Sequence, residues 1–215
     1  MKKAKIATLL LVCALALNAC GSKNNNNEGG NASPTLTETP AEPTPTETTE
    51  DNNSGADDNF DDLMPAASDE LTSIRDAVAA QYGDNYAPSM QYDKETIENL
   101  FGVAPELYDY AIAEGPMISA HVDTFAAFHA TEGNADAIEE ALNNYRDILV
   151  NDTFQYPMNV LKIQASKVYK NGDYVFFIML GFIEDQSSIT EDEQFIEEYA
   201  KLNQLAVDAI ESILK

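Results

Sequence analysis

The sequence predicts an α+β fold in which helices pack on one roughly four-stranded antiparallel sheet built from two hairpins. Three observations support this prediction. Several stretches repeat apolar residues at intervals of three and four, as amphipathic helices do. Other stretches are short, rich in β-branched and aromatic residues, and bounded by Gly, Pro or Asn. Their order along residues 60–215 is α-α-β-β-α-β-β-α, and we expect a single domain that is long enough to bury its own core.

The first two elements are expected to be helices. One should begin near Ser68 and end at Gly83, because apolar residues recur at helical spacing between them. These residues are Leu71, Ile74, Val78 and Tyr82. A shorter helix is expected from Asp93, which can cap it, to Phe101, with Gly102 ending it. Its apolar face is predicted to consist of Ile97, Leu100 and Phe101.

Two hairpins should form the sheet. In the first, Glu106–Ala113 and Met117–Ala130 are the predicted strands, and Gly115-Pro116 makes the turn. In the second, Ala165–Lys170 and Asp173–Ile183 flank Asn171-Gly172, a dipeptide that favours a tight turn. The last of these strands is almost entirely apolar, which indicates a central strand covered on both faces.

Two longer helices complete the expected domain. Asn134–Val150 carries one apolar stripe, formed by Ile138, Ala141, Leu142, Tyr145, Ile148 and Leu149. Thr190–Leu214 should be the final helix, with Thr190 and Glu193 forming a capping box. Between these helices, Asn151–Gln164 is predicted to be irregular, because Pro157 interrupts it.

The first twenty residues have the pattern of an export signal. Lys2, Lys3 and Lys5 form a basic start, and Ile6–Leu17 is an apolar core that is too short for a comfortable membrane span. The tetrapeptide Leu17-Asn18-Ala19-Cys20 then resembles the lipobox of bacterial lipoproteins. The resemblance implies a signal peptide over residues 1–19 and a diacylglyceryl group on Cys20. Ordinary secretion and an uncleaved N-terminal anchor are the alternatives.

Cysteine usage agrees with this prediction. Cys13 lies inside the predicted signal peptide, which leaves Cys20 as the one cysteine of the mature chain. A single cysteine forms no internal disulfide, so the domain must be stable through its core alone. The same count excludes a thiol nucleophile within the domain and a zinc site made of cysteines.

Residues 20–59 are expected to be a lipidated cysteine followed by a disordered tether. From Lys23 to Asn59 the chain is built mainly of Asn, Thr, Pro, Glu, Gly and Asp, and it cannot bury enough apolar surface to fold. The formal charge of −25 becomes −28 once Lys2, Lys3 and Lys5 are removed. Such a chain should be repelled by nucleic acid and by anionic lipid headgroups. It favours cationic, neutral or metal-bearing partners, unless the charge serves solubility alone.

Four segments in the middle of the chain carry a family resemblance. They are Gly115–Ala120, Asn151–Asn159, Lys162–Val168 and Gly172–Phe177. Together they resemble the family called domain of unknown function 4358, over roughly Leu71 to Phe182. The resemblance implies a lipoprotein of the Firmicutes with a polar linker. It brings no established activity, and therefore no catalytic residues.

Motifs of known chemistry are scarce. His121 and His129 are expected on one strand, where eight residues would separate them by about 26 Å, too far to share a metal. We find no GxSxG elbow and no phosphate-binding loop in the sequence. The acidic groups Glu184-Asp185 and Glu191-Asp192-Glu193 lack the spacing of a calcium loop. We therefore predict no metal, no cofactor and no catalytic residue.

The best candidate for a working surface is the segment around Pro157. Phe154, Tyr156 and Met158 occupy alternate positions, so in an extended chain they would share one face, either as a binding patch or as part of the core. We expect a lipid-anchored, extracytoplasmic, non-enzymatic binding or structural module whose partner is the membrane together with an envelope protein or wall component. A carboxylate-dependent envelope enzyme and a subunit docked on a membrane complex are the alternatives.

Overall fold

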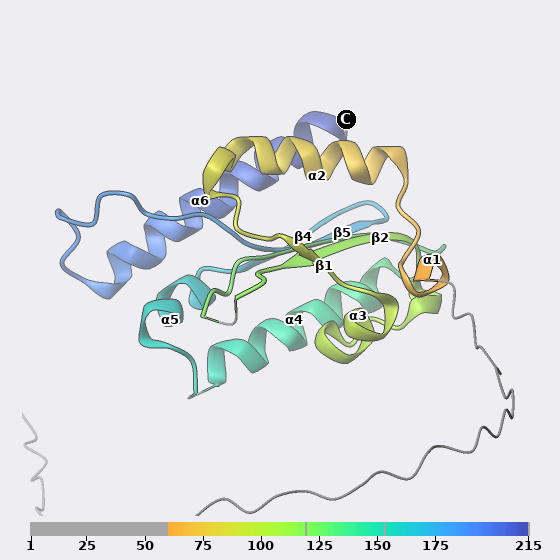
Figure 1. The fold of residues 1–215 in the computed structure, drawn as a ribbon, viewed down its shortest axis with the longest axis horizontal. Coiled ribbons are helices and arrows are strands. Elements are labelled where there is room, and N and C mark those ends of the chain that lie inside the picture. Colours follow the sequence, from red (N-terminus) through yellow and green to blue (C-terminus); the bar gives the residue numbers. More distant parts are fainter. Residues whose placement is uncertain (1–59, 119, 153, 215) are drawn as a thin grey trace, which may run out of the picture. The chain divides into compact units, whose positions relative to one another are not determined.

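The computed structural model describes residues 60–118, 120–152 and 154–214. The predicted signal peptide, the lipobox and the tether lie outside these residues. Within the described part, an antiparallel sheet lies between two layers of helices (Figure 1). The fold is therefore α+β, as predicted from the sequence.

The sheet has five strands in the order β1-β2-β3-β5-β4, and every neighbouring pair is antiparallel. The strands are β1 (Met90–Gln91), β2 (Tyr108–Gly115), β3 (Thr124–Ala130), β4 (Lys167–Asn171) and β5 (Tyr174–Met179). The two predicted hairpins, β2-β3 and β4-β5, are present, and β5 is central as expected. The prediction of four strands missed β1, because two exposed residues at an edge are too few to show an alternating pattern.

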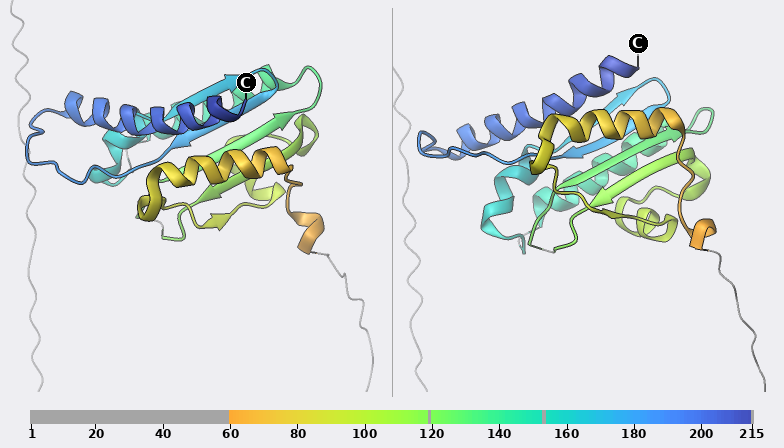
Figure 2. Two further views of the ribbon diagram at one scale, coloured as in Figure 1. Left: turned by 90° about the horizontal axis from the view of Figure 1, so that it is seen from above. Right: turned by 45° about the horizontal axis from the view of Figure 1, so that its top comes forward.

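The helices cover both faces of the sheet. They are α1 (Phe60–Leu63), α2 (Asp69–Tyr82), α3 (Lys94–Phe101), α4 (Ala135–Asn151), α5 (Pro157–Gln164) and α6 (Asp192–Ile213). Helices α2 and α6 lie side by side on one face, while α3 and α4 lie on the other (Figures 1 and 2). Helix α5 contacts both α4 and α6. It is thus placed at the end of the sheet, where the two layers meet (Figure 1).

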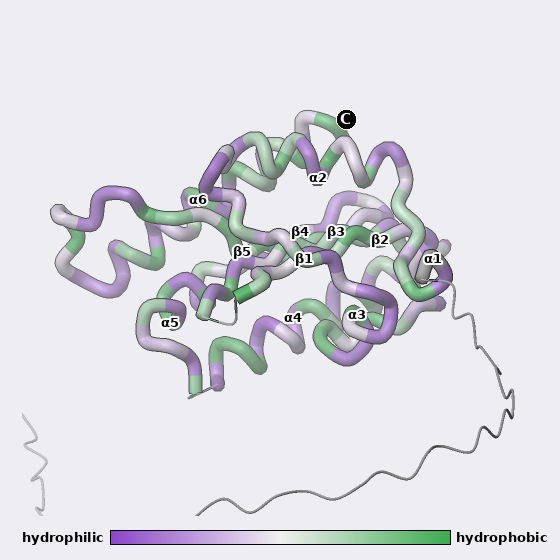
Figure 3. Tube along the Cα trace, in the orientation of Figure 1, coloured by the Kyte–Doolittle hydropathy of each residue, from purple (hydrophilic) through white to green (hydrophobic). Residues whose placement is uncertain are grey.

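Alternation along the strands divides the core in two. On β5, Val175, Phe177 and Met179 face α3 and α4, whereas Phe176 and Ile178 face α2 and α6. A strand that is apolar on both faces must be covered on both, which explains the continuous hydrophobic run. Along each helix, hydrophobic and hydrophilic colouring alternates, as expected of helices with one buried face (Figure 3).

Local capping explains where the first helices begin. Ser68 Oγ accepts a hydrogen bond from the backbone N–H of Leu71 at 3.1 Å, and α2 starts at the next residue, Asp69. Asp93 Oδ1 accepts from the N–H of Thr96 at 2.7 Å, and Gly102 ends α3 with a φ of +70°. The Asp93 cap matches the sequence prediction, and α2 starts next to Ser68, where the first helix was expected to begin. A cap depends on residues only three positions apart.

Two predicted elements around the end of the sheet are wrong. The expected strand Met117–Ala130 begins only at Thr124, since β3 pairs with β5 from Thr124 and with β2 from Phe125. The described residues 116–118 and 120–123 lie outside any strand. The expected irregular segment contains α5, which begins at Pro157. Proline is compatible with the first helical position, because the N–H that it lacks has no partner there.

Several boundaries differ by one residue or a few. Asn171 pairs with Tyr174, so the second hairpin turns at Gly172-Asp173, one position later than predicted. Strand β5 ends at Met179, four residues before Ile183. The capping box of α6 consists of Glu191 and Gln194, because the helix starts two residues after Thr190.

Two residues assigned to helix faces lie in solvent. Leu100 is 38% exposed and Ile148 is 69% exposed, whereas their neighbours Phe101 and Tyr145 are buried. Only part of each helix surface faces the sheet, so an apolar residue at the edge of the apolar stripe can lie outside the core.

Candidate functional site

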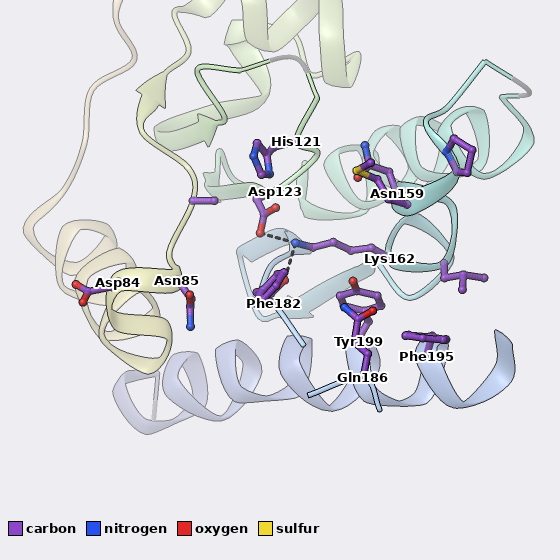
Figure 4. A pocket seen from close by; sticks show the side chains of 15 residues that line it. Asp84, Asn85, His121, Asp123, Asn159, Lys162, Phe182, Gln186, Phe195 and Tyr199 are labelled. Atoms are coloured by element: carbon purple, nitrogen blue, oxygen red, sulfur yellow. Dashed lines mark hydrogen bonds and ion pairs between the residues drawn. The ribbon is translucent and has the colours of Figure 1, made fainter. Parts of the chain in front are cut away.

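A cavity opens at the end of the sheet beside α5. It has a volume of about 450 Å³. Its walls come from the loop before β3, the first turns of α5, the segment after β5, the turn after α2, and α6 (Figure 4). The volume is within the range of small-molecule and side-chain pockets in proteins.

A buried ion pair forms the floor of this cavity. Lys162, on α5, places Nζ 2.5 Å from Oδ1 of Asp123, the residue before β3. The same ammonium donates to the carbonyl oxygen of Gly181 at 2.6 Å and lies 5.7 Å from the ring centroid of Tyr199 on α6. Only 8% of the Lys162 side chain and 7% of the Asp123 side chain are exposed. Figure 4 shows Lys162 reaching across the cavity toward Asp123.

This ion pair is largely shielded from solvent. Burial lowers the pKa of the Lys162 ammonium, and the neighbouring Asp123 carboxylate opposes that shift. Removing two charges from water is costly, and a hydrophobic pair of similar size often gives equal or greater stability. A perturbed ionisable group in a cavity is accordingly a candidate for function.

The backbone around the cavity is fixed by buried polar contacts. Asn203 of α6 is fully buried; its Oδ1 accepts from the N–H of Leu180, and its Nδ2 donates to the carbonyl of Ala165. Asn159 Nδ2 donates to the carbonyl of Ala120 at 3.0 Å, which ties α5 to the loop before β3. These contacts hold the walls in place, because breaking any of them would leave a buried polar group without a partner.

Gly181 allows α6 to approach the cavity closely. Its φ is +96°, and a Cβ built on it would lie 2.9 Å from Cβ of Leu202. Glycine tolerates both the positive φ and the short approach. The carbonyl that receives Lys162 therefore depends on a residue without a side chain.

An apolar rim of exposed side chains lies at the cavity and along the segment that leads into α5. We use this name for Phe154, Tyr156, Met158 and Phe182, which are 94%, 53%, 73% and 58% exposed. Met158 and Phe182 line the cavity themselves, and Phe154 and Tyr156 lie in the segment that leads into α5. Next to His121, another lining residue, the loop before β3 exposes Met117 and Ile118 as well.

Comparison with known proteins gives one match, in the middle of the chain. Residues 81–180 match the family described as Domain of unknown function (DUF4358). The match supports the domain family that the sequence resembles. No curated protein and no solved structure matches the chain.

The DUF4358 segment contains both members of the buried ion pair. Asp123 and Lys162 lie inside residues 81–180, as do Asn159 and three members of the apolar rim. Phe182, Tyr199 and the rest of α6 follow the matched segment. The floor of the cavity therefore belongs to the DUF4358 segment, and one of its walls is supplied by the C-terminal helix.

The segment predicted as a binding loop is exposed, but it is not extended. Met158 lies in the first turn of α5, so the alternate-face geometry expected for Phe154, Tyr156 and Met158 is wrong. The helix instead turns Met158 toward the cavity. That these three residues bind a partner stays a prediction.

The two histidines are separated, and only one belongs to the site. His121 lines the cavity from the loop before β3, and so the prediction that it lies on the strand is wrong. His129 lies on β3, with its ring 4.8 Å from that of Tyr174 and its Nδ1 3.7 Å from Asp109. Among the described residues, no group of three or more His, Cys, Asp or Glu side chains could hold a metal ion.

The acidic groups near α6 have local roles. Asp185 accepts from the N–H of Ser187, and Glu191 caps α6.

Within the described part of the chain, no helix is long and apolar enough to cross a membrane.

The sequence prediction missed Lys162 and Asp123. A weak signal for the first was present, since Lys162 stands between Leu161 and Ile163 in an otherwise apolar stretch. Asp123 gave none, because it was assigned to a strand that begins one residue later.

Proposed function

We propose that the protein is a membrane-anchored, extracytoplasmic lipoprotein that acts as a non-enzymatic binding module of the cell envelope. The location is supported by the basic start, the apolar core and Leu17-Asn18-Ala19-Cys20. The polar segment Lys23–Asn59, with its prolines, has the composition of a tether that keeps a domain clear of the bilayer.

The observation that carries the binding function is the apolar rim, whose side chains are exposed at the cavity and in the segment that leads into α5. Scattered apolar side chains are normal on any protein surface, but apolar side chains gathered around a hollow mark an interaction site. Phe154 is 94% exposed, and folding of this chain gains almost nothing from it. Its burial by a partner would supply the kind of aromatic anchor on which binding energy concentrates.

The cavity supports binding better than carboxylate catalysis. Glycoside hydrolysis uses two carboxyl groups on either side of the scissile bond, one as an acid and the other as a base or nucleophile. The carboxylates that line this cavity are Asp84 and Asp123, and Asp123 is already paired with Lys162. An envelope enzyme acting through paired acids is therefore the less supported alternative.

Changing Phe154 and Tyr156 together to Ser tests this proposal. Both side chains are exposed, so the free energy of unfolding should stay within about 0.5 kcal/mol of the original. Crosslinking in intact cells, followed by mass spectrometry, should yield a partner adduct from the unchanged protein. The double variant should lose that adduct, because the anchors of the interface are gone.

The matched control is Ile148→Ser, which removes an apolar side chain that is 69% exposed on α4. This variant should keep the adduct. An adduct that survives in the double variant, or a double variant that loses several kcal/mol of stability, would show that the apolar rim is not a binding surface.

A further inference from the structure

Carboxylates border the apolar rim. We call Asp84, Asp152, Glu184 and Asp185 the acidic margin; all four are exposed. Asp84 lines the cavity directly, and Asp152 accepts from the N–H of Phe154 at 2.9 Å. Glu184 accepts from Nδ2 of Asn85, another lining residue, at 3.2 Å. Asp84 and Glu184 therefore lie at or beside the cavity, Asp152 lies beside Phe154, and Asp185 follows Glu184 in the chain.

Cationic charge at the cavity is already neutralised. Among the described residues, Lys162 supplies the lysine side chain of the cavity lining, and its ammonium is buried against the carboxylate of Asp123. Among the carboxylates and the lysine of the lining, Asp84 is then the charge that no partner in the lining balances. A ligand entering over this margin experiences a negative potential, which favours positive charge in the ligand.

The same charge argues against three alternative occupants. A second copy of the chain would bring another acidic margin, and each mature chain carries a formal charge of −28. The chain's own segment Lys23–Asn59 has eight acidic residues and one lysine. Anionic lipid headgroups would likewise be repelled. What remains is a cationic partner with apolar side chains to offer.

Resting on the proposed binding function, we infer that the apolar rim and acidic margin bind a basic amphipathic segment of another polypeptide. One apolar side chain of the partner enters the cavity against Met158 and Phe182. Its Lys or Arg residues pair with the acidic margin, and a cation can also lie over the exposed ring of Phe182. Apolar contacts supply the affinity, and the charges supply orientation and the rate of encounter.

A synthetic peptide provides a direct test. The full mature lipoprotein, held in phosphatidylcholine nanodiscs, is titrated with an amphipathic helix of about 20 residues that has Leu on one face and Lys on the other. The control peptide has Glu in place of every Lys. The Lys peptide should bind at least about tenfold more tightly than the Glu peptide, and its affinity should fall when NaCl is raised from about 50 mM to about 300 mM.

Paired variants locate the binding site. Phe154→Ser with Phe182→Ser, and Glu184→Gln with Asp185→Asn, should each weaken binding by at least about fivefold. Glu95→Gln with Glu140→Gln removes two exposed carboxylates from α3 and α4 and should leave the affinity unchanged. Equal weakening by this control pair would show non-specific attraction to an acidic protein and overturn the inference.

Three further outcomes would also overturn it. If the Glu peptide binds as well as the Lys peptide, the acidic margin has no role. If phosphatidylglycerol vesicles bind the protein and the Phe154 and Phe182 changes abolish that binding, the surface contacts lipid. If the peptide fails to bind while the cellular adduct depends on Phe154 and Tyr156, the module binds a partner of different chemistry, and only the basic-segment inference fails.

Discussion

Replacing Asp123 with Asn is expected to lower the free energy of unfolding by about 3–5 kcal/mol at neutral pH. The change keeps the shape of the side chain but leaves the Lys162 ammonium buried without its counter-charge. The carbonyl of Gly181 and the amide oxygen at position 123 could still accept hydrogen bonds from that ammonium, but neither carries a negative charge. Urea denaturation of the full chain, with the slope of the transition as a check on two-state behaviour, gives the difference.

A double variant separates the charge from the packing. Lys162→Met with Asp123→Leu removes both charges and keeps apolar bulk, so its stability should lie within about 1–2 kcal/mol of the original or exceed it. If the double variant is stable and still yields the partner adduct, the ion pair has only a structural role. A double variant that is stable but has lost the adduct would assign the pair to binding.

The loss in free energy of unfolding caused by Asp123→Asn, called the deficit below, should also depend on pH. Burial holds the pKa of Lys162 in the folded protein below its ordinary value of 10.5, and Asp123 opposes that shift. Between the two pKa values the unfolded chain binds more protons than the folded one, so stability rises with pH. Without Asp123 the folded-state pKa falls further. The deficit should therefore be largest near neutral pH and shrink as the pH approaches 10.5, whereas a deficit that grows with pH would contradict the account of the buried pair.

Replacing Phe177 with Ala should have an effect of similar size. Phe177 lies on β5, is fully buried, and has its ring centroid 5.0 Å from that of Tyr145 and 6.3 Å from that of Phe101. Removing the ring loses its transfer free energy and leaves a cavity between the sheet and α4, at a cost of about 3–5 kcal/mol. The expected result is a lower denaturation midpoint with an unchanged slope.

Phe154→Ala is the matched control, because it removes the same ring from a position that is 94% exposed. Its stability should stay within about 0.5 kcal/mol of the original. If the two phenylalanine variants lost similar amounts of stability, the core proposed between the sheet, α3 and α4 would be wrong.

The sequence predicted those parts of the fold whose causes are local. Ser68 and Asp93 cap their helices through bonds to residues three positions away, and a window of a few residues reveals such caps. The second hairpin follows from Asn171-Gly172 and the apolar run after it, although the turn itself lies one residue later. Strand β1 and helix α5 were missed, because β1 is two residues long and α5 begins at a proline.

The candidate site could be predicted only in part, because tertiary packing assembles it. Lys162 and Asp123 are 39 residues apart in the chain, and no spacing rule connects them. Phe154, Tyr156 and Met158 form an apolar cluster in a segment with no predicted helix or strand, and such a signal is local. Their neighbour Phe182 was assigned to a covered strand, but β5 ends at Met179 and leaves the ring in solvent.

The partners open to this domain depend on whether it lies outside the cytoplasm, as we propose. The most direct measurement is mass spectrometry of the N-terminal peptide of the protein purified from the membrane fraction. We expect a chain that begins at Cys20 and carries a diacylglyceryl group on its thiol. A Cys20→Ser variant should be released from the membrane or remain an uncleaved precursor. A chain that keeps Met1, or one with an unmodified Cys20 and unchanged membrane association, would contradict the proposed lipid anchor.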